Sequence, residues 1–477
     1  MIRLPPASPG SHRAILAAAG LAVLTLGALA VLHPELRFVD FIPFAARTYR
    51  LLHGPVDDPL VPVLDGGDLV NGLYPVGYPL LLVLGQALLG DVLVAGKVLA
   101  VLAGVGAIAG AARVCGLGAA AWMLAQGVVL LHGSMEGTDL PAAALALAAL
   151  AALHDRRSTL AGALAGAAVM MRYTGVAVVP VVLLAAPSRP RAFFALLVAT
   201  APHWLVAAWT GASVWPDQSQ NLTIAAGHPT TLLSLETLAR WPFGVWRALT
   251  AGLGTWPVAL GGLGLLLGAI RRDRRALLLL AYALVHAALL GVAFSNPRLA
   301  LPVTACAALG AGWLLPPRRL ALGAGLLLLW NLRTAVAPDP VAERAAAVSV
   351  AVSTVEGPCL STSPWVYQRR DGWLIPSIDL TGLRVAPLTP GTLRSLARQH
   401  GAACVALDVT RTRGAWPGLH DLLGSGPVPG YRRLEDPAGW RIWAVEADPA
   451  DVSSPVTPAP GAPARAAPPL EAPGVPR

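Results

Sequence analysis

The chain has 477 residues, of which 55% are hydrophobic and only 13% are charged, and it carries a formal net charge of +9. Soluble globular domains usually have about 25% charged residues, so this composition excludes an ordinary soluble protein and indicates an integral membrane protein. The positive charge comes almost entirely from arginine, since Lys97 is the only lysine. These arginines stand in short clusters between apolar segments, as in membrane proteins, which argues against nucleic-acid binding.

Apolar segments predict an all-α polytopic membrane bundle of about 11 transmembrane helices in residues 1–335. The first segment, 14–32, favours an uncleaved span over a signal peptide, because no clear small-residue cleavage site follows it. The other segments lie at 92–112, 117–131, 140–153, 158–171, 173–186, 192–210, 244–270, 276–294, 298–315 and 319–333. Several are shorter than the roughly 20 residues that a perpendicular helix needs, so short pairs could be partly re-entrant.

The positive-inside bias orients these segments. With the N-terminus in the cytoplasm, alternation along the spans places most of the arginine-bearing connectors on the cytoplasmic side: Arg113, Arg156, Arg157, Arg189, Arg191, Arg271, Arg272, Arg274, Arg275, Arg318 and Arg319. Arg172 falls on the outer side. The agreement of most connectors with the bias favours residues 74–90 as a helix at the outer interface, and not as a further span. The first outer loop, 33–91, then shares the outer side with the turn 132–139 and with everything after residue 333.

After residue 335 the composition changes and predicts a small extracytoplasmic α/β domain, 336–446. The expected elements are a helix at 341–357, a strand beginning near Cys359, a helix at 390–400 capped by Thr389, a buried strand around Cys404, a short helix at 417–425 and a closing hairpin. The tail, 447–477, is rich in Pro and Ala, cannot bury a core and is predicted to be disordered.

The four cysteines fall into two pairs. Cys115 and Cys306 lie in or beside apolar segments and are expected to be packing residues. Cys359 and Cys404 lie in the α/β region, where they could form a disulfide if that region is outside the cytoplasm. The sequence gives no distance between them and leaves this pairing open. No Cys spacing typical of a metal site is present.

The first outer loop carries the strongest functional signal. Asp40 stands among aromatic and aliphatic residues, and an amphipathic helix then runs to about residue 52, with Arg47 on its polar side. A carboxylate in an apolar interfacial setting costs free energy, so it is expected to pair with a cation or to have a function. Partial desolvation would raise its pKa and suit it to general-base catalysis. Pairing with Arg37 or Arg47, for topology alone, is the alternative.

The order of the outer motifs resembles the GT-C superfamily, the polyprenyl-phosphate-sugar-dependent glycosyltransferases of the protein-mannosyltransferase and aminoarabinose-transferase type. An Asp in the first outer loop is followed by four motifs: Y-P-V-G-Y-P-L-L at 74–81, G-T-D-L-P at 137–141, M-R-Y-T-G at 171–175 and S-N-P-R-L at 295–299. No single motif is unique; their order and common side of the membrane carry the resemblance. It implies a membrane enzyme that moves a sugar from a polyprenyl-phosphate donor, its lipid-linked substrate, to an acceptor. No cofactor is assigned.

The resemblance also implies roles for individual residues. Asp40 would take a proton from the acceptor hydroxyl in an inverting displacement. Arg298, at the outer start of a span, is the best candidate for binding the donor phosphate, because a guanidinium stays charged and binds oxygens in a fork. Snorkelling to the interface is its alternative. Arg172 could also face the site, or serve topology or packing.

Glu136 and Asp139 form a second acidic turn on the same side, where the superfamily commonly places a residue that helps the first-loop Asp or binds a cation. The alternative is helix capping, which suits Asp139 well. Tyr74 and Tyr78 are candidates for lining the lipid or sugar path, although interfacial aromatics occur in most membrane proteins. No Asp-x-Asp or Asp-Glu pair accompanies Asp40, so a metal-dependent site is not predicted.

Two other classes of function stay open. A multipass transporter would explain the spans, but it commonly has two related halves with broken helices, and no such repeat is visible. A catalytically inactive scaffold with the same fold is the second. The acceptor could be a lipid, a glycan or a protein. The expected location is a bacterial inner membrane, with the N-terminus cytoplasmic and the C-terminal domain periplasmic.

Overall fold

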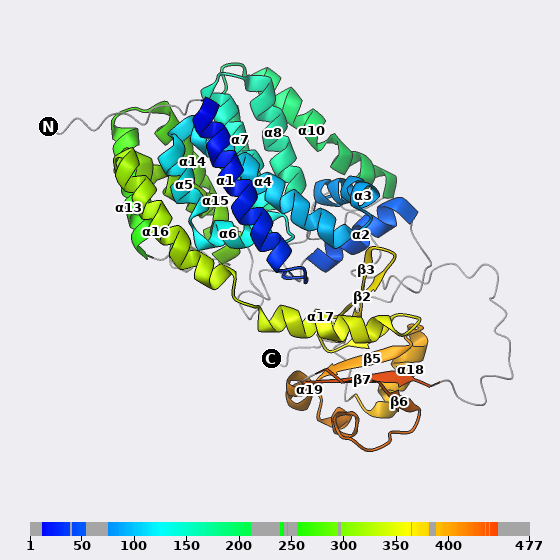
Figure 1. Cartoon of the computed structure of the whole chain (residues 1–477). Coiled ribbons are helices and arrows are strands. Elements are labelled where there is room, and N and C mark those ends of the chain that lie inside the picture. Colours follow the sequence, from blue (N-terminus) through cyan, green and yellow to red (C-terminus); the bar gives the residue numbers. More distant parts are fainter. Residues whose placement is uncertain are drawn as a thin grey trace.

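The computed structural model describes residues 12–38, 41–53, 75–210, 239, 241–242, 246, 255–293, 297–363, 365–380, 388–434, 436–437 and 439–446. They form a large helical bundle, with a small region of strands and helices on one side of it (Figure 1). The helices of the bundle precede the strands in the chain. The predicted disordered tail lies outside the described residues.

The helices of the bundle follow the apolar segments of the sequence. They are α1 (His12–Leu32), α2 (Phe41–His53), α3 (Gly77–Leu89), α4 (Val92–Cys115), α5 (Leu117–Leu124), α6 (Gly127–Ser134), α7 (Asp139–His154), α8 (Ser158–Met171), η2 (Tyr173–Ala177), α9 (Val178–Ala185), α10 (Arg189–Thr210), α13 (Thr255–Ile270), α14 (Arg274–Ala293), η3 (Pro297–Ala300), α15 (Leu301–Gly310), η4 (Ala311–Trp313) and α16 (Pro317–Ala335). Each predicted span therefore contains a helix, which for 244–270 is described from residue 255 onward.

Few of these helices reach the length of a bilayer. Within the described residues, three stretches are long and apolar enough to span one: α1, α4 and Pro317–Ser353. A fourth results if α5 and α6, which bend by 73° at a short break, count as one span. The other apolar helices found by the same test have 10–17 residues. The count of about eleven spans is thus not matched by helix length, because turns and breaks divide the apolar segments into shorter helices.

The surface of the bundle is apolar where a soluble protein would be polar. On α16, the side chains of Leu322, Leu326, Leu329 and Trp330 are all exposed. Such a continuous apolar face has no place in water and is expected to contact lipid. The chain is therefore an integral membrane protein, as its composition predicts.

Small residues let the bundle helices approach closely. On α13, Gly261 and Gly264 lie against the backbone of α15 at Ala307 and Gly310, and a Cβ at either glycine would collide with a carbonyl oxygen of that helix. Close backbone contact of this kind holds membrane helices together through van der Waals packing, since lipid supplies no hydrophobic driving force between them.

The C-terminal region contains a five-stranded sheet in the order β4-β1-β5-β7-β6 and a separate two-stranded sheet, β2-β3. Its elements are α17 (Pro340–Ser353), β1 (Cys359–Ser361), β2 (Tyr367–Arg370), β3 (Trp373–Pro376), β4 (Ile378–Asp379), α18 (Pro390–Gln399), β5 (Cys404–Asp408), α19 (Val409–Ala415), η5 (Pro417–Leu419), α20 (His420–Leu423), β6 (Tyr431–Arg433) and β7 (Trp440–Val445). Strand β1 pairs in parallel with β4 and β5, whereas β7 is antiparallel to β5 and β6.

The sequence predicts most of this region correctly. The helices α17 and α18, the strands β1 and β5 and the β6–β7 hairpin all occur where they are expected. Thr389 caps α18 as predicted, and its hydroxyl accepts a hydrogen bond from the backbone N–H of Thr392. The prediction names no element between the strand near Cys359 and the helix at 390–400, so it misses the β2–β3 hairpin.

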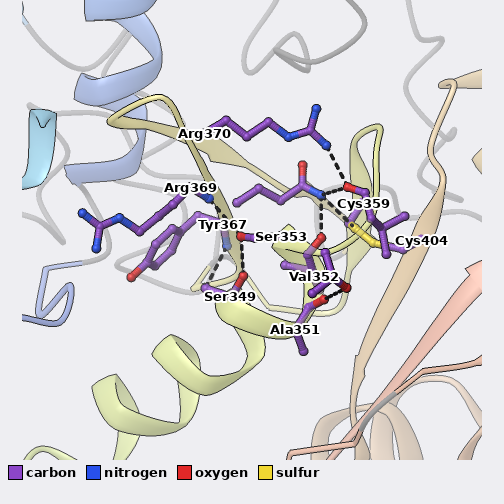
Figure 2. Close-up of a disulfide and its surroundings, with 12 residues drawn as sticks. Ser349, Ala351, Val352, Ser353, Cys359, Tyr367, Arg369, Arg370 and Cys404 are labelled. Carbon is purple, nitrogen blue, oxygen red and sulfur yellow. Dashed lines mark hydrogen bonds between the residues drawn. A yellow bond between two sulfur atoms is a disulfide. The ribbon is translucent and has the colours of Figure 1, made fainter. Parts of the chain in front are cut away.

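A disulfide joins Cys359 and Cys404, which settles the pairing that the sequence leaves open. The two residues are direct partners in the parallel pairing of β1 and β5, with their Cα atoms 4.6 Å apart. Figure 2 shows that two hydrogen bonds join β2 to α17 near this disulfide. The backbone N–H of Tyr367 donates to Ser349 Oγ, and the backbone N–H of Arg369 donates to Ser353 Oγ. Disulfide, helix and hairpin thus form one connected unit.

The β2–β3 hairpin connects the C-terminal region to the bundle and reaches α2 and the start of α4 (Figure 1). At its tip, the carbonyl oxygen of Gly372 accepts a 2.9 Å hydrogen bond from the Val92 N–H. Gly372 has φ of +77° and closely approaches the backbone of Gly90, so a side chain here would be both strained and crowded. Beside it, Arg369 forms an ion pair with Asp91.

Thiol counting tests the disulfide. In protein purified without reductant and then denatured, a thiol reagent should modify only Cys115 and Cys306, because Cys359 and Cys404 are joined. All four should react after reduction, as counted by mass spectrometry. Replacing Cys359 and Cys404 together by Ser should lower the free energy of unfolding by about 2–4 kcal/mol, since the bond closes a long loop. Four reactive thiols before reduction would contradict the assignment.

Candidate active site

The turn between α6 and α7 contacts several segments that are distant from it in the sequence. Its residues Glu136, Gly137 and Thr138, together with Asp139 at the start of α7, each contact a segment that is distant in the sequence. Glu136, Thr138 and Asp139 are buried. This is the second acidic turn of the sequence, so the structure gives both of its carboxylates specific partners.

Glu136 holds the first outer loop. Its Oε1 accepts hydrogen bonds from the backbone N–H groups of Arg37, at 2.6 Å, and Phe38, at 2.7 Å. Its Oε2 lies 3.4 Å from Nζ of Lys97. Burial raises the pKa of the Glu136 carboxyl, whereas the Lys97 ammonium and the neighbouring backbone N–H groups lower it. A buried carboxylate with this many donors is positioned firmly.

Lys97, on α4, holds the same loop from the other side. Its Nζ donates to the carbonyl oxygens of His33, at 2.5 Å, and Glu35, at 2.8 Å. The side chain is only 7% exposed. Lys97 is not among the site residues predicted from the sequence. One feature of the sequence could have identified it, because it is the only lysine of the chain and lies in an apolar helix, where a cation often has a function.

Tyr78, on α3, supports the turn and α2. Its hydroxyl accepts a 3.2 Å hydrogen bond from the backbone N–H of Gly137. Its ring packs edge-to-face against Phe44 and Phe41, with centroids 5.2 and 6.3 Å away. The side chain is fully buried and in use within the protein. A role in lining the path of lipid or sugar stays a prediction.

Asp139 and Arg172 form a second buried ion pair. Nη1 of Arg172 lies 3.1 Å from Asp139 Oδ1 and donates to Thr138 Oγ1 at 3.0 Å. Thr138 is the N-cap of α7, but its side chain makes no capping hydrogen bond. Asp139 is already the first residue of the helix, where its charge favours the helix dipole. The side chains of this turn therefore bind Arg172 in place of capping α7.

The segment that carries Arg298 lies close to this pair. His286, on α14, is near enough to Arg172 and Asp139 for an electrostatic interaction, and its Nε2 is 2.9 Å from the carbonyl oxygen of Leu299. With Nε2 protonated, the imidazole donates to that oxygen. The backbone of Arg298, in η3, is therefore next to the residue that His286 holds. The side chain of Arg298 lies outside the described part of the structure.

The environment of Asp40 is described on both sides. Asp40 and Tyr74 themselves lie outside the described residues. Phe38 and Phe41, which flank Asp40 in the sequence, are both buried, and the backbone N–H of Phe41 donates to the Phe38 carbonyl at 2.9 Å. Arg47, which the sequence places on the polar side of α2, is instead buried. The helix packs against α3 and β3, and Arg47 is near enough to Tyr173 for an electrostatic interaction.

Among the described residues, no group of three or more His, Cys, Asp and Glu side chains is arranged to hold a metal ion. The two buried carboxylates are instead paired with Lys97 and Arg172. The structure brings together Glu136, Asp139, Arg172 and Tyr78 of the predicted site and adds Lys97.

A search of the solved structures finds a protein with the same architecture. The crystal structure of ArnT from Cupriavidus metallidurans bound to undecaprenyl phosphate matches 90% of this chain and 97% of its own, with a TM-score of 0.59 and 15% sequence identity. The chain has the fold of ArnT. The apo structure of the same protein matches 90% of this chain and 98% of its own, with a TM-score of 0.51 and 15% identity.

No protein-family model matches the chain, and a search of the curated proteins gave no match either. The likeness to ArnT is one of architecture. At 15% identity it establishes the fold alone. The chemistry of the site has to be argued from the residues themselves.

The Asp139–Arg172 pair provides a test of the site's framework. Arg172→Met should lower the free energy of unfolding by about 3–5 kcal/mol, because it leaves a buried carboxylate without its partner. Adding Asp139→Asn should recover part of this loss, which a double-mutant cycle on thermal unfolding in detergent would measure. Arg113→Met removes a 56% exposed partner of Asp155 and should cost less than about 1 kcal/mol. Equal losses for Arg172→Met and Arg113→Met would contradict the buried pairing.

Proposed function

We propose that the chain is a membrane glycosyltransferase that moves a sugar from a polyprenyl-phosphate carrier to an acceptor on the outer face of the membrane. The observation that carries the proposal is the attachment of the first outer loop to the acidic turn through Glu136 and Lys97. The attached segment ends two residues before Asp40, the proposed base. The fold shared with ArnT supports the same reaction class.

The proposed reaction is an inverting displacement. The acceptor hydroxyl attacks the anomeric carbon of the sugar, and the bond from that carbon to the phosphate oxygen breaks. Asp40 takes the hydroxyl proton, and the polyprenyl phosphate leaves with the bonding electrons. Because the leaving phosphate is already a weak base, no strong general acid is required. The site must instead stabilise the charge that grows on the phosphate.

Arginines are the proposed phosphate ligands. Arg298 is the first candidate, because η3 brings its backbone next to the segment held by His286. Arg172 can contribute as well, since its Nη1 binds Asp139 and Thr138 while a guanidinium carries five N–H donors in all. The lipid tail of the donor would lie along the apolar surface of the bundle, which also contacts membrane lipids.

The proposed location is a bacterial inner membrane, with residues 336–446 in the periplasm. The Cys359–Cys404 disulfide supports an oxidising compartment for this part of the chain. The proposed division is a transferase domain at 1–335, the extracytoplasmic domain at 336–446 and a disordered tail at 447–477. The β2–β3 hairpin contacts α2, which is part of the first outer loop. This contact suits a role of the C-terminal domain in selecting the acceptor.

The role of Asp40 is tested by comparing the wild type with Asp40→Asn. Purified protein should release sugar from a radiolabelled polyprenyl-phosphate sugar in the presence of a membrane lipid and glycan extract. The variant keeps the shape of the side chain but removes the base, so turnover should fall about 10²–10⁴-fold while thermal unfolding stays unchanged. Equal turnover by both proteins would show that Asp40 is not the base.

The hairpin is tested by Trp373→Ala. Trp373 is buried and packs edge-to-face against Tyr49 of α2, with centroids 5.3 Å apart, so its loss should weaken the contact by about 3–5 kcal/mol. The KM for the acceptor should rise, with little change in the KM for the donor. Trp416→Ala is the matched control, because Trp416 packs against the core of the five-stranded sheet. An unchanged acceptor KM in Trp373→Ala would contradict a role in acceptor selection.

A further inference from the structure

The segment 33–38 has no helix or strand to fix its shape. Its conformation depends instead on contacts with other elements. Lys97 of α4 binds two of its carbonyl oxygens, and Glu136 binds two of its N–H groups. The His33 imidazole lies 2.8 Å from the carbonyl oxygen of Ala335, through Nε2, and 3.2 Å from Glu35 Oε1, through Nδ1. Lys97 and Glu136, which also pair with each other, thus form a clamp that binds both carbonyl oxygens and N–H groups of the segment.

The Lys97 ammonium faces three oxygen atoms of the protein. It donates hydrogen bonds to the His33 carbonyl at 2.5 Å and the Glu35 carbonyl at 2.8 Å, and it pairs by charge with Glu136 Oε2 at 3.4 Å. A phosphate could reach this buried ammonium only by replacing Glu136 or one of the two carbonyls, so we do not assign the side chain as a phosphate ligand.

The choice of lysine at this position fits such a clamp. The chain has 35 Lys and Arg residues, and Lys97 is the only Lys. An ammonium is a compact charge whose donors diverge toward three oxygens around one point, whereas a guanidinium presents a planar fork. Lys97 faces two carbonyls of one loop and a carboxylate of another element. This arrangement matches the diverging donors of an ammonium better than the planar fork of a guanidinium.

We infer that Lys97 is a positioning residue for Asp40, acting through the segment 33–38 together with Glu136. This inference rests on the proposed transferase function. Phe38 is the last residue that the clamp holds, and Asp40 follows it by two residues. The clamp fixes Phe38, and the N–H of Phe41 donates to the carbonyl of Phe38, so the chain is held on both sides of the proposed base. A displacement of about 1 Å at a reacting group can cost on the order of 10²-fold in rate.

The experiment measures turnover and donor KM for the wild type, Lys97→Met, Lys97→Arg and Arg113→Met. Lys97→Met should lower kcat at least about 30-fold, with donor KM and the shape of the pH profile unchanged, because the base is misplaced but still titrates. Lys97→Arg should restore only part of the rate. Arg113→Met removes a cation from the other end of the same helix and should behave like the wild type.

A double mutant separates positioning from general loss of structure. In an Asp40→Asn background, Lys97→Met should cost no more than about twofold, because a displaced base matters only while the base is present. A further large loss there, or wild-type kcat in Lys97→Met, would overturn the inference and leave the transferase function standing. Full activity in Lys97→Arg would also overturn it, since a phosphate ligand tolerates that change. If the wild type uses no donor, the transferase proposal fails and takes this inference with it.

Discussion

The burial of two carboxylates in one turn constrains the segments that meet at that turn. Glu136 is 0% and Asp139 5% exposed, and an unpaired buried charge costs several kcal/mol. Each therefore needs a cation, and the two cations come from different helices, α4 and α8–η2. Because Lys97 and Glu136 also bind the first outer loop, the same pairing fixes the loop that leads to Asp40. The position of the loop is in this way a consequence of one electrostatic requirement.

The C-terminal region is tied to that same loop. Tyr367, Trp373 and Leu374 of the β2–β3 hairpin belong to one buried cluster with Leu36, Phe38 and Phe41. The hairpin is held in turn by α17, close to the disulfide. The apolar side of the first loop thus packs partly on the bundle and partly on the C-terminal region. A region attached there can affect what reaches the loop, and this is the physical basis for assigning it to acceptor selection.

Local patterns predicted the elements well, because apolar length and turn chemistry are encoded within a few neighbouring residues. The helices of the apolar segments, the capping by Thr389 and the β6–β7 hairpin all belong to this class. What the sequence missed depends on contacts between distant residues. Lys97 binds a loop about 60 positions away, and Arg369 pairs with Asp91 across 278 positions. The breaks within the apolar segments were missed as well, since an apolar segment does not reveal where its helix breaks.

The proposed roles of Lys97 and of the arginines differ because their donor groups have different geometries. Lys97 donates hydrogen bonds to two carbonyl oxygens of the loop and pairs by charge with Glu136, so in this buried position its charge is used within the protein. Arg172 uses Nη1 on Asp139 and Thr138, and a guanidinium can hold a carboxylate on one edge while its other N–H groups remain available. An arginine can therefore belong to the framework and to a phosphate site together, whereas this lysine cannot. A donor phosphate should accordingly be bound by Arg298 and Arg172, with Lys97 acting only through the loop that it holds.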